Sequence, residues 1–284
     1  MFIIHQSLVA DGPFFDDLEP KRRRHFRGRN DLAVAGVDWN TGAQIPVDPP
    51  DWDDMIASSL RVGMDAAKKT FKPAMVIWVA MIGIAALYYL APATHVVFNA
   101  ITAFQNKTGV YFASIGMGLS VGVLVECVKV MTSAEKRWTQ ANTVNGIFNF
   151  LVFGIMGVTQ YYRYAWQVEV FGGGNSFREL TTKVLFDQFV WTVLFANPYQ
   201  AILYLWKNTG FSWKSVGRLM FPFRTFWGTQ MLPVLISNWA FWIPMAYLVY
   251  FFPPELQVPM AILAVAIWVM LLSFLTANTR HDES

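Results

Sequence analysis

The stretch PAMVIWVAMIGIAALYYLAPATHVVFNAITAFQN, residues 73–106, contains no Lys, Arg, Asp or Glu. A helix needs about 20 mostly apolar residues to cross a hydrocarbon core ~30 Å thick, because it rises roughly 1.5 Å per residue. Further uncharged stretches follow at 108–125, 138–162, 188–206, 225–254 and 256–279. Each is close to the length of one span, so the sequence predicts an all-α, polytopic membrane helical bundle of five to six transmembrane helices.

The composition agrees with a membrane protein, because 55% of the 284 residues are hydrophobic and only 14% are charged. Soluble proteins average about 25% charged residues. The charges gather in residues 1–71, which we expect to form a polar N-terminal extension, whereas 72–284 form the transmembrane domain. Near the end of the extension, apolar residues such as Met55, Leu60 and Met64 recur at helical spacing. This pattern predicts an amphipathic helix near 53–70 that lies on the membrane surface.

The basic residues predict the orientation of the spans. We place the spans near 73–91, 109–131, 142–166, 184–206, 229–252 and 257–277. With six spans, the side of the two termini collects Arg61, Lys68, Lys69, Lys72, Lys129, Lys136, Arg137, Lys207, Lys214, Arg218, Arg224 and Arg280. The opposite side collects Lys107, Arg163, Arg178 and Lys183. Cytoplasmic loops carry the excess of Lys and Arg, so both termini are predicted on the cytoplasmic or matrix-like side; a re-entrant span would leave five.

Two carboxylates inside the predicted spans are candidates for a pore or a polar cluster. A carboxylate within a span turns inward, pairs with a cation or marks an ion path. Glu126 precedes Lys129 by one helical turn, and Asp187 follows Lys183 by four residues. Local ion pairs are therefore the simpler expectation for both acids. The alternative is that they form part of a polar pathway, with Asp187 at its mouth.

Uncharged polar residues extend this set of candidates: Asn149, Gln160, Gln188 and Asn238. Asn149 and Gln160 belong to a polar stripe of one predicted span that also contains Asn142, Asn145 and Arg163. Such amides either line water or hydrogen-bond to neighbouring helices, and the sequence leaves both readings open for this stripe. For Asn238, which lies near mid-span, a bond to a neighbouring helix is expected.

Small residues form a separate pattern in the second predicted span. Ser114, Gly118 and Gly122 recur every four residues and lead to Glu126, so all four share one helix face. Small side chains at this spacing let two helices approach closely, with a gain in van der Waals packing. We therefore expect this face to be a helix-packing surface. Ser120 lies roughly opposite it and is expected to tolerate a larger side chain.

The sequence contains no recognisable motif of an enzyme, a metal site or a cofactor site. Its four histidines are far apart and Cys127 is the single cysteine, which excludes an intramolecular disulfide and a cysteine-rich metal site. The net charge of +3 is too small to suggest a nucleic-acid partner. We therefore expect no catalysis, no cofactor and no metal. The expected partner is the lipid bilayer, with a homo-oligomer or a membrane complex left open.

Several segments carry a resemblance to a known family. The segments are Lys183 with Asp187-Gln188, Pro233 with Asn238-Trp239, Trp268 with Leu271-Leu272-Ser273, and the glycines Gly154 and Gly157 before Tyr161-Tyr162-Arg163. Over roughly residues 110–276 the chain resembles the Mpv-seventeen family of peroxisomal and mitochondrial inner-membrane proteins. It departs from that family at Val123, where an acid is usual, at Val193, where a proline is usual, and at Gln257, where an arginine is usual.

The resemblance implies a membrane protein without an established enzymatic reaction. The leading functional hypothesis that follows is a small pore or a transport-related protein for small solutes or ions. Its membrane would be a bacterial inner (plasma) membrane or, in a eukaryote, the mitochondrial inner or peroxisomal membrane. The alternative is a non-catalytic scaffold subunit with no permeation path. A continuous polar cavity lined by Glu126, Asn149, Gln160 and Asp187 would favour the pore, and local hydrogen bonds at each would favour the scaffold.

Overall fold

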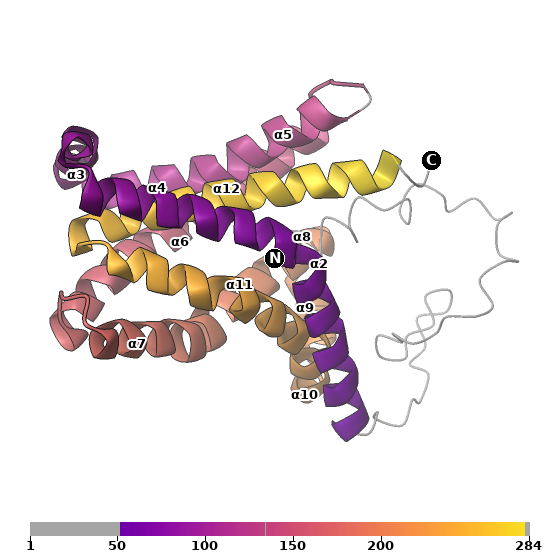
Figure 1. Cartoon of the computed structure of the whole chain (residues 1–284). Helices are drawn as coiled ribbons and strands as arrows, with labels where there is room; N and C mark the ends of the chain where they lie inside the picture. The colour runs from indigo at the N-terminus through magenta and orange to yellow at the C-terminus, as the bar shows by residue number, and fades with distance from the viewer. Residues whose placement is uncertain (1–51, 134, 282–284) are drawn as a thin grey trace, which may run out of the picture.

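The computed structural model describes residues 52–133 and 135–281, with side chains up to residue 270, and this part of the chain forms helices joined by short turns (Figure 1). It contains no strand, so the predicted all-α class is confirmed for the described residues. Residues 1–51 of the predicted extension, which spans 1–71, lie outside them.

The α-helices and one 3₁₀ turn are interrupted by three π-helical segments. The 3₁₀ turn is η1 (Pro92–Thr94), and the π-helical segments are η2 (Leu119–Val123), η3 (Phe186–Ala196) and η4 (Trp227–Met231). The α-helices are α2 (Trp52–Leu90), α3 (His95–Thr108), α4 (Val110–Gly118), α5 (Leu124–Thr132), α6 (Gln140–Phe171), α7 (Phe177–Leu185), α8 (Asn197–Asn208), α9 (Trp213–Met220), α10 (Phe223–Phe226), α11 (Leu232–Phe251) and α12 (Pro254–His281).

Four helical stretches are long and apolar enough to cross a membrane: Trp52–Leu90, Val110–Thr132, Gln140–Phe171 and Phe223–Phe251. They are compatible with an integral membrane protein. The two other predicted spans also fall on helices, 184–206 on the run from α7 through η3 to α8 and 257–277 on α12. The count of five to six spans stays a prediction.

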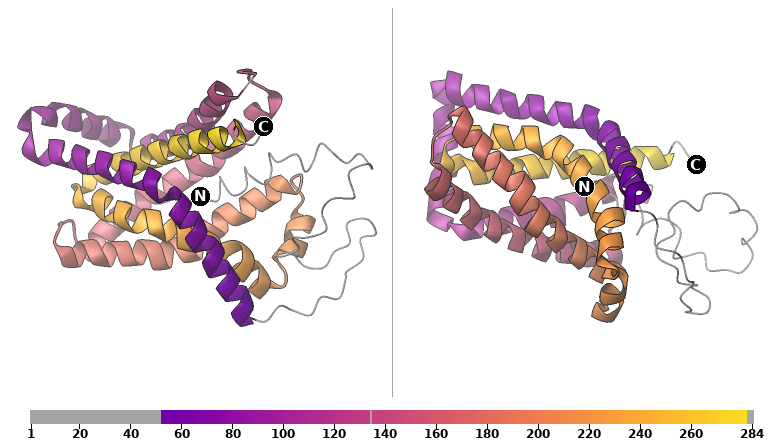
Figure 2. Two further views of the ribbon diagram at one scale, coloured as in Figure 1. Left: turned by 45° about the vertical axis from the view of Figure 1, so that its right-hand side comes forward. Right: turned by 90° about the horizontal axis from the view of Figure 1, so that it is seen from below.

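Successive helical stretches run back and forth along the bundle (Figures 1 and 2). The start of α2, the α5–α6 connection, α9 and the end of α12 lie toward one end. The α2–α3 turn, the α6–α7 turn and the α11–α12 turn lie toward the opposite end. The core between them is built from buried apolar side chains of α2, α4, α6, α11 and α12.

The predicted amphipathic helix near 53–70 and the first predicted span belong to one helix, α2, which contains Pro73 and bends sharply between its two halves (Figure 2, left). One face of its first half packs on η4 and α11. The Ser59 hydroxyl donates a hydrogen bond to the Gly228 carbonyl over 2.6 Å, and a Cβ at Gly63 would lie 2.8 Å from the Pro233 carbonyl oxygen. Leu60 and Met64, which share the predicted apolar stripe, are exposed.

The glycine face of α4 and η2 lies directly against α6. A Cβ at Gly118 would lie 2.9 Å from the Phe150 carbonyl oxygen, and a Cβ at Gly122 would lie 2.7 Å from the Gly146 carbonyl oxygen. Only glycine permits this approach, since Cβ atoms essentially never come within 3.0 Å of such atoms. The expectation that Ser120 tolerates a larger side chain is wrong. Ser120 is buried, and the segment η2 packs against α12 as well as against α6.

Candidate functional site

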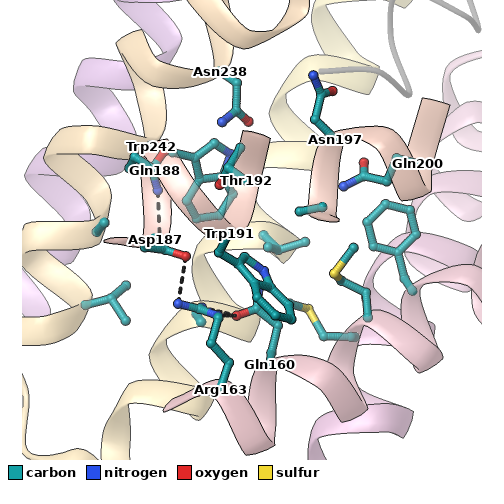
Figure 3. A pocket seen from close by; sticks show the side chains of 18 of the residues that line it. Gln160, Arg163, Asp187, Gln188, Trp191, Thr192, Asn197, Gln200, Asn238 and Trp242 are labelled. Carbon is teal, nitrogen blue, oxygen red and sulfur yellow. Dashed lines mark hydrogen bonds and ion pairs between the residues drawn. The ribbon is translucent and has the colours of Figure 1, made fainter. Parts of the chain in front are cut away.

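A cavity of about 130 Å³ lies inside the bundle (Figure 3). It lies between α6, η3 with the start of α8, α11 and α12, and Met117 of α4 closes one side. Its polar lining comprises Gln160, Arg163, Tyr164, Asp187, Gln188, Thr192, Asn197, Gln200 and Asn238, and its tryptophans are Trp191, Trp242 and Trp268. These residues fall near the middle of their helical stretches, so the cavity is at mid-depth in the bundle.

The π-helical segment η3 supplies one wall of the cavity. Each N–H of a π-helix bonds to the carbonyl five residues earlier, so the helix takes more residues per turn than the 3.6 of an α-helix. The lining residues of this stretch follow that wider spacing, at 187–188, 191–192, 196–197 and 200. The π-helix therefore keeps these side chains on one face. Pro198, which lacks an N–H, lies two residues after the end of the segment, in the first turn of α8, where a proline is tolerated.

An ion pair between two helices lies at the edge of this cavity. Arg163 Nη1 of α6 lies 2.6 Å from Asp187 Oδ1 of η3, and the two residues are 4% and 8% exposed. The same Nη1 donates to the Tyr250 hydroxyl over 2.6 Å. That hydroxyl donates in turn to Gln167 Oε1 over 2.6 Å. Gln160 Oε1 accepts from Arg163 Nε over 3.1 Å, so the guanidinium is held from several directions.

The expected ion pair between Lys183 and Asp187 is not formed. The carboxylate pairs with Arg163 instead, and Lys183 Nζ is buried with no hydrogen-bond partner among the described residues. The spacing of four residues brings two side chains together on an α-helix, but η3 begins between them at Phe186. The change of helix type turns Asp187 toward α6 and α11.

Two of the four basic residues that the topology prediction assigned to the side away from the termini are buried. Arg163 and Lys183 were expected near a span end, facing solution. They are 4% and 0% exposed. Lys107 and Arg178 are the two of the four predicted basic residues that remain exposed at that end.

Several polar groups around the cavity have no partner within the described part of the chain. Gln188 is 2% exposed, and its Nε2 donates to Asp187 Oδ2 over 3.2 Å, but its Oε1 accepts no hydrogen bond. The indole nitrogens of Trp191 and Trp268 are likewise buried without an acceptor. Asn238, which was expected to bond to a neighbouring helix, lines the cavity. Buried polar groups are normally satisfied by protein, water or a ligand.

The structure separates Glu126 and Asn149 from the other predicted site residues. Glu126 is fully buried, and its carboxylate lies 3.0 Å from Lys129 Nζ and accepts from Asn142 Nδ2 over 2.8 Å. Asn149 Oδ1 accepts from the Tyr204 hydroxyl over 2.7 Å. Neither acid nor amide lines the cavity. Gln160, Asp187, Gln188 and Asn238 are brought together, so one continuous cavity containing all the candidates is not what the structure shows.

Sequence reasoning missed the residues that complete the site. Tyr250, which accepts from the guanidinium, lies far from Arg163 along the chain. Gln167 follows Arg163 by four residues on α6, a spacing that could have identified it. Trp191 and Trp268 line the cavity, but the sequence marked Trp268 only as part of the family resemblance and not as a site residue. Arg163 was named only as a member of the polar stripe and as a basic residue near a span end, not as a site residue.

Comparison of the chain with protein-family models, with curated proteins and with solved structures finds no match. Within the described residues, no group of three or more His, Cys, Asp or Glu could hold a metal ion. The site is therefore interpreted from its own geometry: a polar, aromatic-walled cavity at mid-depth with one internal ion pair.

Proposed function

We propose that this protein is a transport-related membrane protein and that the cavity holds a small solute during its passage across the bilayer. The observation that carries the proposal is the position of the cavity: polar groups without partners converge at mid-depth among helices that are otherwise apolar. Burying such groups is costly unless something binds them. A scaffold subunit would need no such site.

The π-helix beside the cavity supports the same proposal. Non-helical or irregular backbone at membrane depth is tolerated where it is buried in protein or lines a cavity, and interrupted helices at the midplane are typical of solute sites in secondary transporters. Here η3 is the irregular segment, and Asp187, Gln188 and Trp191 project from it. The Arg163–Asp187 pair joins α6 to η3 and would have to separate or shift for a solute to pass.

The resemblance to the Mpv-seventeen family remains part of this proposal, together with a six-span topology. Residues from three segments that carry the resemblance line the cavity, namely Asp187-Gln188, Asn238 and Trp268. The proposed location is a bacterial inner (plasma) membrane or, in a eukaryote, the mitochondrial inner or peroxisomal membrane. The local bonds of Glu126 and Asn149 favour the second candidate function, a scaffold subunit with no permeation path.

Flux through liposomes that contain the purified protein tests the proposal. The solutes are urea and glycerol as uncharged probes and K⁺ and Cl⁻ as ions. Asp187→Asn removes one charge of the pair and leaves Arg163 uncompensated, so Cl⁻ flux, which the neutral pair of the wild type keeps low, is expected to rise relative to K⁺ flux. Glu126→Gln is the matched control, because it neutralises another buried carboxylate that lies outside the cavity. It should leave every flux at the wild-type level.

The double variant Arg163→Gln/Asp187→Asn guards against a single variant that fails to fold. It restores charge balance in the cavity, so its ratio of cation to anion flux is expected to return toward that of the wild type. Folded wild-type protein that passes none of these solutes under any applied voltage would contradict the transport proposal and favour the scaffold.

A further inference from the structure

We infer that the cavity is a binding site for a small uncharged solute that carries both a hydrogen-bond donor and an acceptor, of the amide or urea class. That the bound solute crosses the membrane rests on the proposed function. That it binds does not, because binding can be measured without flux.

The charge balance of the lining favours an uncharged solute. Arg163 and Asp187 are the only charged side chains among the described residues that line the cavity, and they neutralise each other over 2.6 Å. The guanidinium is further held by Tyr250 and Gln160. An ion in the cavity would therefore be a new, uncompensated charge in an environment of low dielectric constant, which is costly.

The unpartnered groups define the rest of the ligand. Gln188 Oε1 is a buried acceptor without a donor, and the indole N–H groups of Trp191 and Trp268 are buried donors without an acceptor. A carbonyl oxygen would accept from an indole N–H, and an amide N–H would donate to Gln188 Oε1. A single amide or urea molecule supplies both.

The walls of the cavity distinguish such a solute from water alone. A water molecule needs only about 10–15 Å³ of cavity volume, whereas the cavity measures about 130 Å³. Trp191, Trp242 and Trp268 contribute flat aromatic surfaces to it. The flat face of a planar amide can stack on such rings, which a water molecule cannot do.

The test uses two pairs of probes that match in shape and differ in charge. Acetamide is compared with acetate, and urea with guanidinium, each at millimolar concentration. The readout is the indole ¹⁵N–H spectrum of the full chain in detergent micelles, with signals assigned through Trp191→Phe and Trp268→Phe. We expect acetamide and urea to shift the Trp191 and Trp268 signals saturably, and acetate and guanidinium to leave them in place.

A tryptophan outside the cavity provides the matched control. Trp206 also has a buried indole N–H without an acceptor, but it does not line the cavity. Trp191→Phe should weaken acetamide binding, read from Trp268, by about three- to tenfold, the effect of one hydrogen bond. Trp206→Phe should leave the affinity unchanged.

Two results would overturn the inference: shifts by the charged probes as large as those by their neutral partners, or no saturable shift of either signal by any probe. Saturable binding in a protein that passes no solute would overturn the transport proposal and leave this inference standing. Solute flux without any shift of the two signals by acetamide or urea would overturn this inference and leave the transport proposal standing.

Discussion

Substituting Gly122 with alanine should separate two helices of the bundle. The Cβ of alanine would lie 2.7 Å from the Gly146 carbonyl oxygen and 2.7 Å from the Phe150 backbone nitrogen, both on α6. Backbone atoms cannot rotate away as a side chain can, so the helices must move apart. Overpacking of this kind costs about 1–3 kcal/mol, and helix association in a membrane depends on the close packing that would be lost.

Gly83→Ala is the matched control for this substitution. Gly83 also lies within a long helix, α2, but a Cβ there would meet no atom within 4 Å. Alanine restricts the unfolded chain and favours the helix, so this variant should be unchanged or more stable by about 0.4–1 kcal/mol. The two variants therefore change the same atoms and differ only in what those atoms contact.

The single cysteine provides the assay. Cys127 is partly buried, and a thiol-reactive dye will label it as the protein unfolds in detergent. Thermal curves rank the variants, and titration with sodium dodecyl sulfate in mixed micelles gives the free-energy difference. Equal stability of the two variants, or a Gly122→Ala variant as stable as the wild type, would refute the role that we assign to the glycine face.

Two further predictions concern topology and the ion pair. In a Cys127→Ala background, cysteines at Ser133 and Ser212 should react with an impermeant thiol reagent from one side of the membrane and a cysteine at Asn175 from the other; labelling of all three from one side would contradict six spans. Arg163→Gln should destabilise the protein by about 3–5 kcal/mol, because it leaves the Asp187 charge buried and unpaired. Adding Asp187→Asn should recover part of that loss in the same titration, and a double variant whose loss equals the sum of the losses of Arg163→Gln and Asp187→Asn would show that the pair is not coupled.

The helices could be predicted from sequence because their signal is local. A long stretch without charge, such as 138–162, needs no knowledge of its neighbours to be read as an apolar helix, and α6 covers it. The ion pair of Glu126 was equally accessible, since Lys129 is one turn away on the same helix. In both cases the feature lies within one helix, so the helical repeat alone determines which side chains are neighbours.

The cavity could not be predicted in the same way, because it depends on contacts between helices. The partner of Asp187 was sought at Lys183, on the assumption of an α-helical repeat, and the π-helix removes that repeat where it matters. The neighbours that satisfy Arg163 come from α6 and α11. No pattern within one helix identifies such a set, so the sequence supplied individual polar residues but not their grouping.

The number of residues in η3, and not only their types, determines which side chains face the cavity. A π-helix takes more residues per turn than an α-helix, so removing one residue between Phe186 and Ala196 would shift the segment toward α-helical geometry. Each residue of an α-helix turns the chain by about 100°. A change of that size in register would rotate Asn197 and Gln200 relative to Asp187, and the cavity would lose one wall. Single-residue deletions and insertions in this segment should therefore be tolerated less well than substitutions, and the number of residues between Asp187 and Pro198 is a property that natural variation should keep constant.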